Sequence, residues 1–240
     1  MSADPYANWK GWSPDDFARF SDFDALYFDW HVTRALGTVA RPLCVLEIGF
    51  GNGRFLGWLR QRGHQALGVE ANTRLVAVAR AAGFDAATDA DALKQRQGFD
   101  LIVAFDVLEH VPASATLDFI RSLAQRLAPG GRLLLRFPNG ESPFGLWMQQ
   151  GDLTHVHALG LSKLRQICAE CGLQLEHQGE TLPWHALPRK RQMGARLAAA
   201  ARKVFEWALR KMYQWPRGLD LSPNQLVVLS VVAAADPAVR

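Results

Sequence analysis

The sequence has 240 residues, of which 49% are hydrophobic and 21% are charged. This length suits one or two folded domains, and the composition excludes a disordered or fibrous chain. The formal net charge of +4 is unevenly spread, because residues 189–217 hold nine basic side chains and a single acid, which leaves the rest of the chain mildly acidic. Such asymmetry indicates an anionic partner surface, either a membrane or a nucleic acid.

The N-terminal residues lack the basic and apolar regions of a secretory signal, and the longest apolar stretch, 227–235, is too short to span a bilayer. Three cysteines are too few for a disulfide framework and suit a reducing compartment. We therefore expect a cytoplasmic protein, and peripheral association at the inner membrane face is a further expectation for the basic segment.

Eight aromatic side chains crowd residues 9–30, where they alternate with acids and a Ser-Pro pair. This pattern predicts short helices rather than a pair of strands. Two roles stay open for them. They either pack into the core or cover a ligand site, since aromatic rings give a large contact area at a low entropic cost.

From residue 43 onward, short apolar runs alternate with amphipathic stretches. The predicted strands are 43–46, 66–69, 99–105, 132–137, 173–180 and 225–232, with one more strand before Asp89. The predicted helices are 55–62, 73–82, 116–127, 162–171 and one or two basic helices in 190–213. A turn is expected at 129–131 and a loop at 138–159. This alternation implies crossover connections and a parallel sheet.

We expect one domain over residues 1–240. Its predicted parts are an N-terminal cover (1–40), a cofactor-binding core with an acceptor loop (41–188), a basic helical insertion (189–217), and a final strand and tail (218–240).

A glycine-rich loop, Gly49–Gly53, follows the first predicted strand and opens a helix, so its backbone can approach a ligand closely. The spacing differs from the dinucleotide fingerprint, whose third glycine would fall at Arg54, and no Walker-type Gly-Lys-Ser/Thr follows. A carboxylate at Glu47 would repel a pyrophosphate, and it suits a cation or a ligand with an ammonium group. Glu70 ends the next strand, where a carboxylate can accept both hydroxyls of a ribose.

Three segments resemble class I S-adenosylmethionine-dependent methyltransferases. Val45–Gly53 resembles their motif I, Phe99–Val111 resembles their fourth strand and its loop, and Leu127–Leu133 resembles the motif after their fourth helix. The resemblance implies an α/β, Rossmann-like fold. Its sheet would have seven strands with the last one antiparallel and helices on both faces. The implied cofactor is S-adenosylmethionine.

The resemblance also assigns residues to the cofactor. The implied cofactor-binding residues are Glu47, Gly49, Gly51, Gly53, Glu70, Asp89 and Asp106. Of these, Glu70 would hold the ribose, Asp89 the adenine, and Asp106 would line the sulfonium side.

Residues 137–173 are similar, less closely, to methyltransferases of bacterial surface-polysaccharide gene sets. The shared features are a Pro-Asn loop at 138–139 and an Asp-x-Thr-His segment at 152–155. A helix follows that ends in Cys-Gly-Leu at 171–173, where those relatives have Ala-Gly-Phe, and Ser222–Asn224 matches a segment near their basic insertion. This likeness implies a bacterial enzyme that methylates a sugar hydroxyl on a nucleotide- or lipid-linked glycan precursor.

A protonated hydroxyl is a poor nucleophile, and a positioned base contributes roughly 10²–10⁴-fold to its reaction. Histidine titrates nearest to neutral pH. The first candidate for the base is His155, because Asp152 and Thr154 could orient it, and the second is His110. The alternative for each is a loop histidine bonded to the backbone.

Two further residue patterns could each indicate a metal site. Glu109 and His110 could hold a divalent metal ion, as proposed for ubiquinone-pathway O-methyltransferases, but we expect no metal. The pair Cys168 and Cys171 lacks a second pair for zinc, and we expect structural thiols.

The basic segment has apolar residues at helical spacing, which is typical of a helix on a membrane surface. One alternative is a helix packed on its own domain with a solvated basic face. RNA binding is the third reading, but no RNA-binding module accompanies the segment, so we expect no nucleic-acid partner. The oligomeric state is not predicted.

We therefore predict an S-adenosylmethionine-dependent methyltransferase that modifies an oxygen of a glycan precursor. A methyltransferase of quinones or other small metabolites is the first alternative. A non-catalytic cofactor-binding module of a glycan assembly complex is the second.

Overall fold

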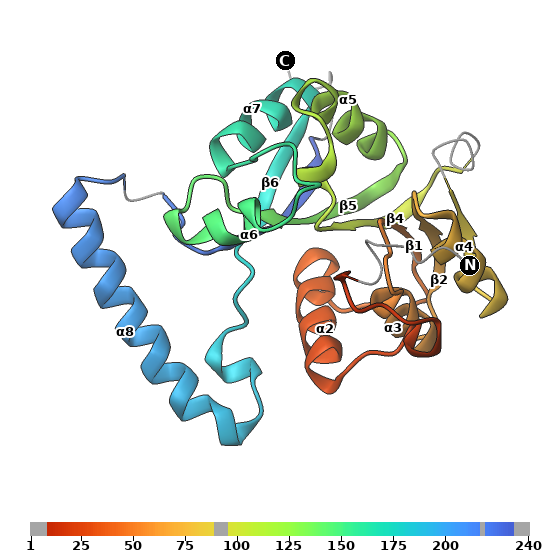
Figure 1. The fold of residues 1–240 in the computed structure, drawn as a ribbon, viewed down its shortest axis with the longest axis horizontal. Coiled ribbons are helices and arrows are strands. Elements are labelled where there is room, and N and C mark those ends of the chain that lie inside the picture. Colours follow the sequence, from red (N-terminus) through yellow and green to blue (C-terminus); the bar gives the residue numbers. More distant parts are fainter. Residues whose placement is uncertain (1–8, 89–95, 217–218, 233–240) are drawn as a thin grey trace, which may run out of the picture.

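The computed structural model describes residues 9–88, 96–216 and 219–232, and its centre is a seven-stranded sheet (Figure 1). The strand order is β3-β2-β1-β4-β5-β7-β6. The strands are β1 (Cys44–Ile48), β2 (Gln65–Val69), β3 (Asp85–Ala87), β4 (Phe99–Phe105), β5 (Leu127–Pro138), β6 (Leu173–Gln178) and β7 (Asn224–Val231). Only β7 runs antiparallel to its neighbours, β5 and β6. The predicted Rossmann-like methyltransferase sheet is therefore confirmed.

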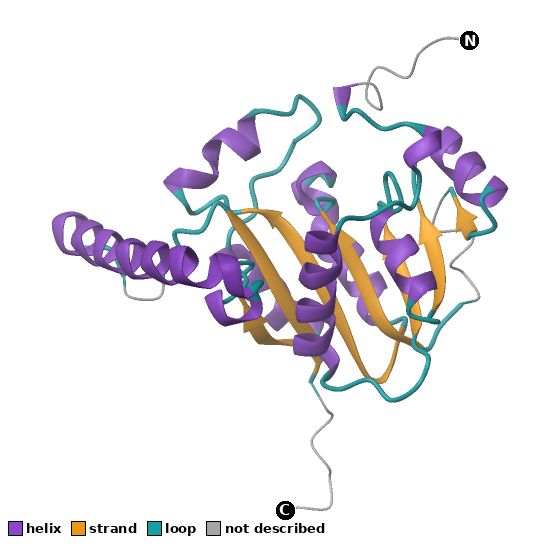
Figure 2. Ribbon diagram, turned by 90° about the horizontal axis from the view of Figure 1, so that it is seen from below, coloured by secondary structure: helices purple, strands orange, loops and turns teal. Residues whose placement is uncertain are grey.

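Helices cover both faces of this sheet (Figure 2). They are α2 (Asp22–Leu36), α3 (Arg54–Gln61), α4 (Thr73–Ala81), α5 (Ala113–Ala124), α6 (Leu146–Gln150), α7 (Leu161–Cys171) and α8 (Arg189–Tyr213). Ile120 of α5 and Leu164 of α7 belong to one core cluster, whereas Phe28 of α2 and Phe55 of α3 belong to a second one. Apolar burial on two sides explains why the central strands are almost continuously hydrophobic.

Local chemistry explains several helix boundaries. Helix α2 begins with a capping box, in which the Ser21 hydroxyl accepts from the Asp24 N–H and the Asp24 carboxylate accepts from the Ser21 N–H. Helix α7 ends at Gly172, which adopts the left-handed conformation with φ +63°. Within α7, burial raises the pKa of the Cys168 thiol to about 11, as fits a structural cysteine.

The structure corrects three sequence-based boundaries. The helix predicted at 116–127 is α5, which begins and ends three residues earlier, so Leu127 starts β5. The turn predicted at 129–131 lies inside β5, where the pairing with β4 changes register between Phe99 and Leu101. The loop predicted at 138–159 contains the short helix α6.

The basic segment forms a single helix, α8, between the last two strands of the chain, β6 and β7. It extends away from the sheet at one side of the molecule (Figure 1). None of its residues is buried. A helix packed on its own domain with a solvated basic face was one alternative, and α8 differs from an ordinary packed helix in burying no apolar face.

Candidate active site

The glycine loop lies between the end of β1 and the start of α3. Gly49, Gly51 and Gly53 have φ values of +68°, +52° and +70°, a region that glycine enters without steric cost. A Cβ atom on Gly49 would lie 2.5 Å from Cγ2 of Val107, so no side chain fits there without displacement. The glycines therefore allow neighbouring side chains to pack closely against the loop.

The N-terminal aromatic segment lies against this loop. Ring atoms of Trp12 lie within 3.0 Å of where a Cβ atom on Gly51 would stand, and the Phe17 ring is similarly close at Gly53. The Ala18 N–H donates to the Asn52 carbonyl at 2.8 Å. The first part of the aromatic segment thus covers the glycine loop, whereas Phe28 belongs to the core.

Two carboxyl groups flank the loop. The Glu70 carboxylate accepts from the Gly51 N–H and from the Asn72 N–H, both at 3.0 Å, and so fastens the loop to the end of β2. Glu47 is buried, and its Oε2 has no hydrogen-bond partner. Burial, reinforced by the nearby charge of Glu70, raises the pKa of Glu47 well above its usual range. An unpartnered buried carboxyl group is costly unless a ligand supplies a donor.

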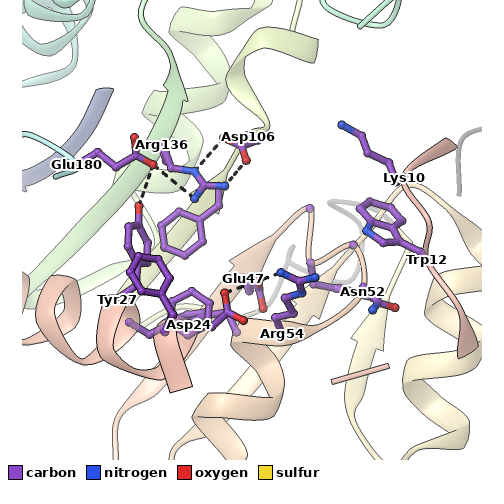
Figure 3. A pocket seen from close by; sticks show the side chains of 17 residues that line it. Lys10, Trp12, Asp24, Tyr27, Glu47, Asn52, Arg54, Asp106, Arg136 and Glu180 are labelled. Atoms are coloured by element: carbon purple, nitrogen blue, oxygen red, sulfur yellow. Dashed lines mark hydrogen bonds and ion pairs between the residues drawn. The ribbon is translucent and has the colours of Figure 1, made fainter. Parts of the chain in front are cut away.

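Opposite Glu47, an arginine joins two acids across the sheet (Figure 3). Arg136 of β5 makes a two-pronged ion pair with Asp106 and lies 3.7 Å from Oε1 of Glu180. The Tyr27 hydroxyl donates to the same Glu180 oxygen at 3.4 Å. Asp106 itself has φ +56°, an uncommon conformation for a residue with a side chain, which often marks functional positions.

These groups line a cavity of about 420 Å³, within the size range of small-molecule sites. The lining residues include Glu47, Gly49, Gly51, Asp106 and Arg136. Figure 3 shows these side chains with Lys10 and Trp12 at the glycine-loop end. The cavity is therefore lined by glycines of the loop, by the buried acid Glu47 and by the ion pair of Arg136 with Asp106.

A second group of titratable side chains gathers after β4 and in the loop before α7. The rings of His110 and His155 are 4.8 Å apart between centroids. Nε2 of His155 lies 3.9 Å from Oε1 of Glu109 and 3.7 Å from Oδ2 of Asp152. Lys10 connects this group to the cavity, since it lines the cavity and its Nζ pairs with Asp152 at 3.2 Å.

Backbone contacts constrain both histidines. Nδ1 of His155 lies 3.2 Å from the Gln149 carbonyl, and Nδ1 of His110 lies 3.2 Å from the Thr154 carbonyl. A carbonyl only accepts hydrogen bonds, so each neutral ring carries its proton on Nδ1 and has a free lone pair on Nε2. Both rings are thus set up to accept a proton at Nε2.

The two acids of this group have opposite protonation preferences. Burial alone would raise the pKa of Asp152, but hydrogen bonds from Thr154 and the Lys10 ammonium lower it to about 2. Burial, helped by the charge of Asp106, raises the pKa of Glu109 to about 8. Near neutral pH, Asp152 is therefore ionised and Glu109 is largely protonated. The pKa of His110 is lowered by burial, which keeps its ring neutral.

Glu109, His110 and His155 also bring potential ligand atoms within 4.8 Å of one another. Two imidazoles and a carboxylate are a donor set that suits zinc or another divalent ion. The arrangement thus permits a metal ion as well as a proton acceptor, and the two can be separated by experiment.

The structure brings most of the predicted site residues into two adjoining groups. Glu47, Gly49, Gly51 and Asp106 line the cavity, while His155, His110 and Asp152 form the second group. Gly53 does not line the cavity but begins α3, and Glu70 supports the loop. Asp89 lies outside the described residues.

Sequence reasoning missed Lys10, Tyr27, Arg136 and Glu180. Arg136 offered a signal, because an arginine flanked by apolar residues in a buried strand needs a polar partner. Tyr27 and Glu180 offered none, since they meet across 153 positions of sequence.

The sheet order, the antiparallel last strand and the glycine loop after β1 define a class I S-adenosylmethionine-dependent methyltransferase, and this enzyme class takes its methyl group from S-adenosylmethionine. A family model described as "Methyltransferase domain" matches residues 21–178, so the chain belongs to that family. Both the predicted enzyme class and the predicted cofactor are confirmed.

Solved structures show the same fold at low sequence identity. A SAM-dependent methyltransferase from Archaeoglobus fulgidus superposes with a TM-score of 0.65 at 16% identity, covering 94% of this chain and 99% of the other. One from Mesorhizobium loti gives a TM-score of 0.55 at 20% identity, covering 90% and 99%.

Curated relatives carry a more specific name. A "Ubiquinone biosynthesis O-methyltransferase" from Leptothrix cholodnii is 26% identical over 190 residues, which span 70% of this chain and 79% of the relative. Another of the same name from Xanthomonas oryzae pv. oryzae is 32% identical over 100 residues, or 38% of this chain and 41% of the relative. Neither is named for polysaccharide biosynthesis.

The residues present fit S-adenosylmethionine. The unpartnered oxygen of Glu47 offers an acceptor to an ammonium group, and Gly49 and Gly51 of the loop line the same cavity without side chains that would fill it. When bound, this cofactor supplies an electrophilic methyl group on a sulfonium centre.

Replacing Glu70 with alanine should lower the affinity for S-adenosylhomocysteine at least about tenfold. The sequence-based prediction makes Glu70 the ribose acceptor, and hydrogen bonds to charged groups contribute roughly 1.5–3 kcal/mol each. The substitution also frees the Gly51 N–H that Glu70 holds. Calorimetry measures the change, and Glu170→Ala, which removes an exposed acid of α7, is the matched control. Unchanged affinity in a folded E70A variant would place the ribose elsewhere.

Proposed function

We propose that this chain transfers a methyl group from S-adenosylmethionine to a hydroxyl oxygen of a small molecule, with quinone-type aromatics as the acceptor class. The observation that carries this proposal is the adjacency of two groups. The cavity beside the glycine loop suits the cofactor, and the histidine group joined to it by Lys10 suits proton removal from a hydroxyl.

The choice of acceptor rests on the relatives. Those described above are named O-methyltransferases of ubiquinone biosynthesis, and the Leptothrix match spans most of both chains. This supports the small-molecule alternative better than the glycan prediction, for which no comparison above offers support. Methylation of a sugar hydroxyl needs the same base, so the acceptor alone distinguishes the two.

In the proposed reaction, the acceptor oxygen forms a bond to the methyl carbon while the carbon–sulfur bond breaks. Nε2 of His155 takes the hydroxyl proton, and the ionised Asp152, 3.7 Å away, stabilises the imidazolium that results. Thr154 holds Asp152 in place with two hydrogen bonds. His110 is the second candidate for the same role, since its ring also presents a free Nε2.

The remaining residues are proposed to bind. Glu47 faces the ammonium group of the cofactor, the glycine loop lies along it, and Glu70 accepts from the ribose. Asp106, held by Arg136, lines the sulfonium side. The sequence-based proposal of Asp89 as the adenine acceptor stands unchanged, as does the division of the chain into cover, core, insertion and tail.

Product analysis with labelled S-adenosylmethionine tests the function. The chain is incubated with hydroxylated aromatic acceptors and, separately, with nucleotide-linked sugars. We expect a methylated aromatic product and an equal amount of S-adenosylhomocysteine. Methylation of the sugars alone would transfer the proposal to glycan precursors. Tight cofactor binding without turnover of either class would favour a non-catalytic module, and NAD binding without S-adenosylhomocysteine binding would contradict the cofactor site.

A further inference from the structure

The exposed face of α8 is apolar, although the helix as a whole is strongly basic. Met193, Leu197, Val204 and Trp207 are between 62% and 66% exposed. With Ala200 they occupy positions i, i+4, i+7, i+11 and i+14, which places them along one side of a helix. A globular protein normally turns such a stripe towards its core, so this one lacks its usual partner.

The partly buried side of α8 combines small apolar residues with polar side chains that form hydrogen bonds. The Arg202 guanidinium donates to Glu206 at 2.7 Å and to the Ser222 hydroxyl at 2.7 Å. The Gln192 amide donates to the Leu187 carbonyl at 2.9 Å. These partly buried residues recur at helical spacing on the side of α8 opposite the apolar stripe. The bond from Arg202 to Ser222 joins this side of α8 to the rest of the protein, and the apolar stripe faces outward.

The apolar surface continues beyond the helix. Phe205 contacts Phe144, with ring centroids 6.1 Å apart, and both rings are exposed. Phe144 lies two residues before the start of α6, where Leu146 and Trp147 are exposed as well. The loop that holds His155 follows α6 in the chain. The exposed apolar residues therefore continue from α8 through α6 towards the loop that holds His155.

Basic side chains flank the stripe. Helix α8 carries eight basic residues against one acid, and Arg196, Lys203 and Lys211 are exposed beside the apolar residues. An apolar stripe with tryptophan, bordered by Lys and Arg, is the composition of helices that lie in the headgroup region of a bilayer. A second copy of this chain is a poor occupant, because it would bring two strongly positive helices together.

We propose that α8 docks the enzyme on a membrane surface rich in anionic phospholipids, with Met193, Leu197, Val204 and Trp207 inserted among the headgroups. Helix α8 lies along the surface, and none of the described helices is long and apolar enough to cross the bilayer. The docked face leads through Phe144 to α6 and the loop of His155. The proposal concerns where the enzyme works and is independent of the acceptor.

Vesicle co-sedimentation of the full chain tests the docking. The probes are vesicles of phosphatidylcholine alone and of phosphatidylcholine with phosphatidylglycerol. We expect binding to the anionic vesicles only, weakening between 0.1 M and 1 M salt as the screening length falls from about 10 Å to about 3 Å. Equal binding to both vesicle types, or to neither, would overturn the proposal.

Two sets of variants separate charge from apolar insertion. Exchanging Arg196, Lys203 and Lys211 for glutamine should lower partition onto anionic vesicles at least about tenfold. The matched control exchanges Arg19, Arg62 and Arg165, exposed basic residues outside α8, and should bind like the wild type. Leu197→Gln with Trp207→Gln should also lower partition at least about tenfold.

Turnover of a soluble acceptor should be the same in all of these variants, which keeps a failure of docking distinct from a failure of the proposed function.

Two other partners of the apolar stripe would give different experimental results. Dimers by light scattering that the L197Q/W207Q variant loses would assign the stripe to a second copy. Binding to an acidic protein and to no vesicle would assign it to a protein partner. Either result would overturn membrane docking.

Discussion

Replacing His155 with alanine should lower turnover by at least about 10²-fold, the usual contribution of a positioned general base. The affinity for S-adenosylhomocysteine should stay unchanged, because His155 does not line the cofactor cavity. Single-turnover measurement of methyl transfer, with calorimetry of the same variant, checks both parts. The matched control is His177→Ala, which removes an exposed histidine of β6.

The companion variant His110→Ala determines which ring takes the proton. The two rings are in contact, so a modest loss is expected at the second position even if only one acts as base. If H110A alone shows the large loss, the role passes to His110. If neither variant shows the large loss of turnover, the acceptor hydroxyl loses its proton without a base from the histidine group.

A metal ion at Glu109, His110 and His155 predicts a different result. Turnover would then fall after treatment with a chelator and return on addition of a divalent cation. The proton-transfer role predicts turnover that a chelator does not change. Both measurements use the wild-type chain and therefore avoid any effect of substitution on folding.

Glu109 should make the folded chain lose stability as the pH rises from about 5 to 8. Its pKa is raised to about 8 in the folded state, against about 4.3 for an unfolded glutamate. Between these values the folded state binds more protons than the unfolded state, so the free energy of unfolding falls with rising pH. A shift of this size corresponds to ~3–5 kcal/mol at most, since each pKa unit is worth about 1.4 kcal/mol.

The variant Glu109→Gln removes this titration and keeps the shape of the side chain. At pH 8 it should therefore melt several degrees above the wild type, while at pH 5 the two should be close. Other groups that titrate in this range are common to both proteins, so the difference between them isolates Glu109. A difference in melting temperature that does not change with pH would show that Glu109 titrates normally.

Much of the fold was predictable because periodicity and glycine placement report local structure directly. The run Phe99–Phe105 is apolar except for Asp100 and was predicted as a buried strand, and Gly172 marked the end of α7 correctly. The start of α5 was misplaced because Pro112 supplies no side-chain cap, which left the boundary without a sequence signal. The helix α6 is too short to show a period at all.

The site was predictable only where it is continuous in the chain. The glycine loop, Glu47 and Asp106 belong to motifs that are read along a single segment. Lys10 and Asp152 form an ion pair although they lie far apart in the sequence, so no local sequence pattern predicts their contact. The exposure of the apolar stripe of α8 was not predictable either. A sequence pattern shows that one side of a helix is apolar, but it does not show whether that side is buried or exposed.

The position of α8 between β6 and β7 has a consequence for how such enzymes diversify. These strands are already paired with each other, with Gln178 opposite Val227, so the chain leaves and re-enters the sheet at neighbouring points. The entropic cost of closing a connection grows only with the logarithm of its length, by about 0.6 kcal/mol per doubling. A connection at this place can therefore gain or lose a helix such as α8 while the pairing of β6 with β7 is kept.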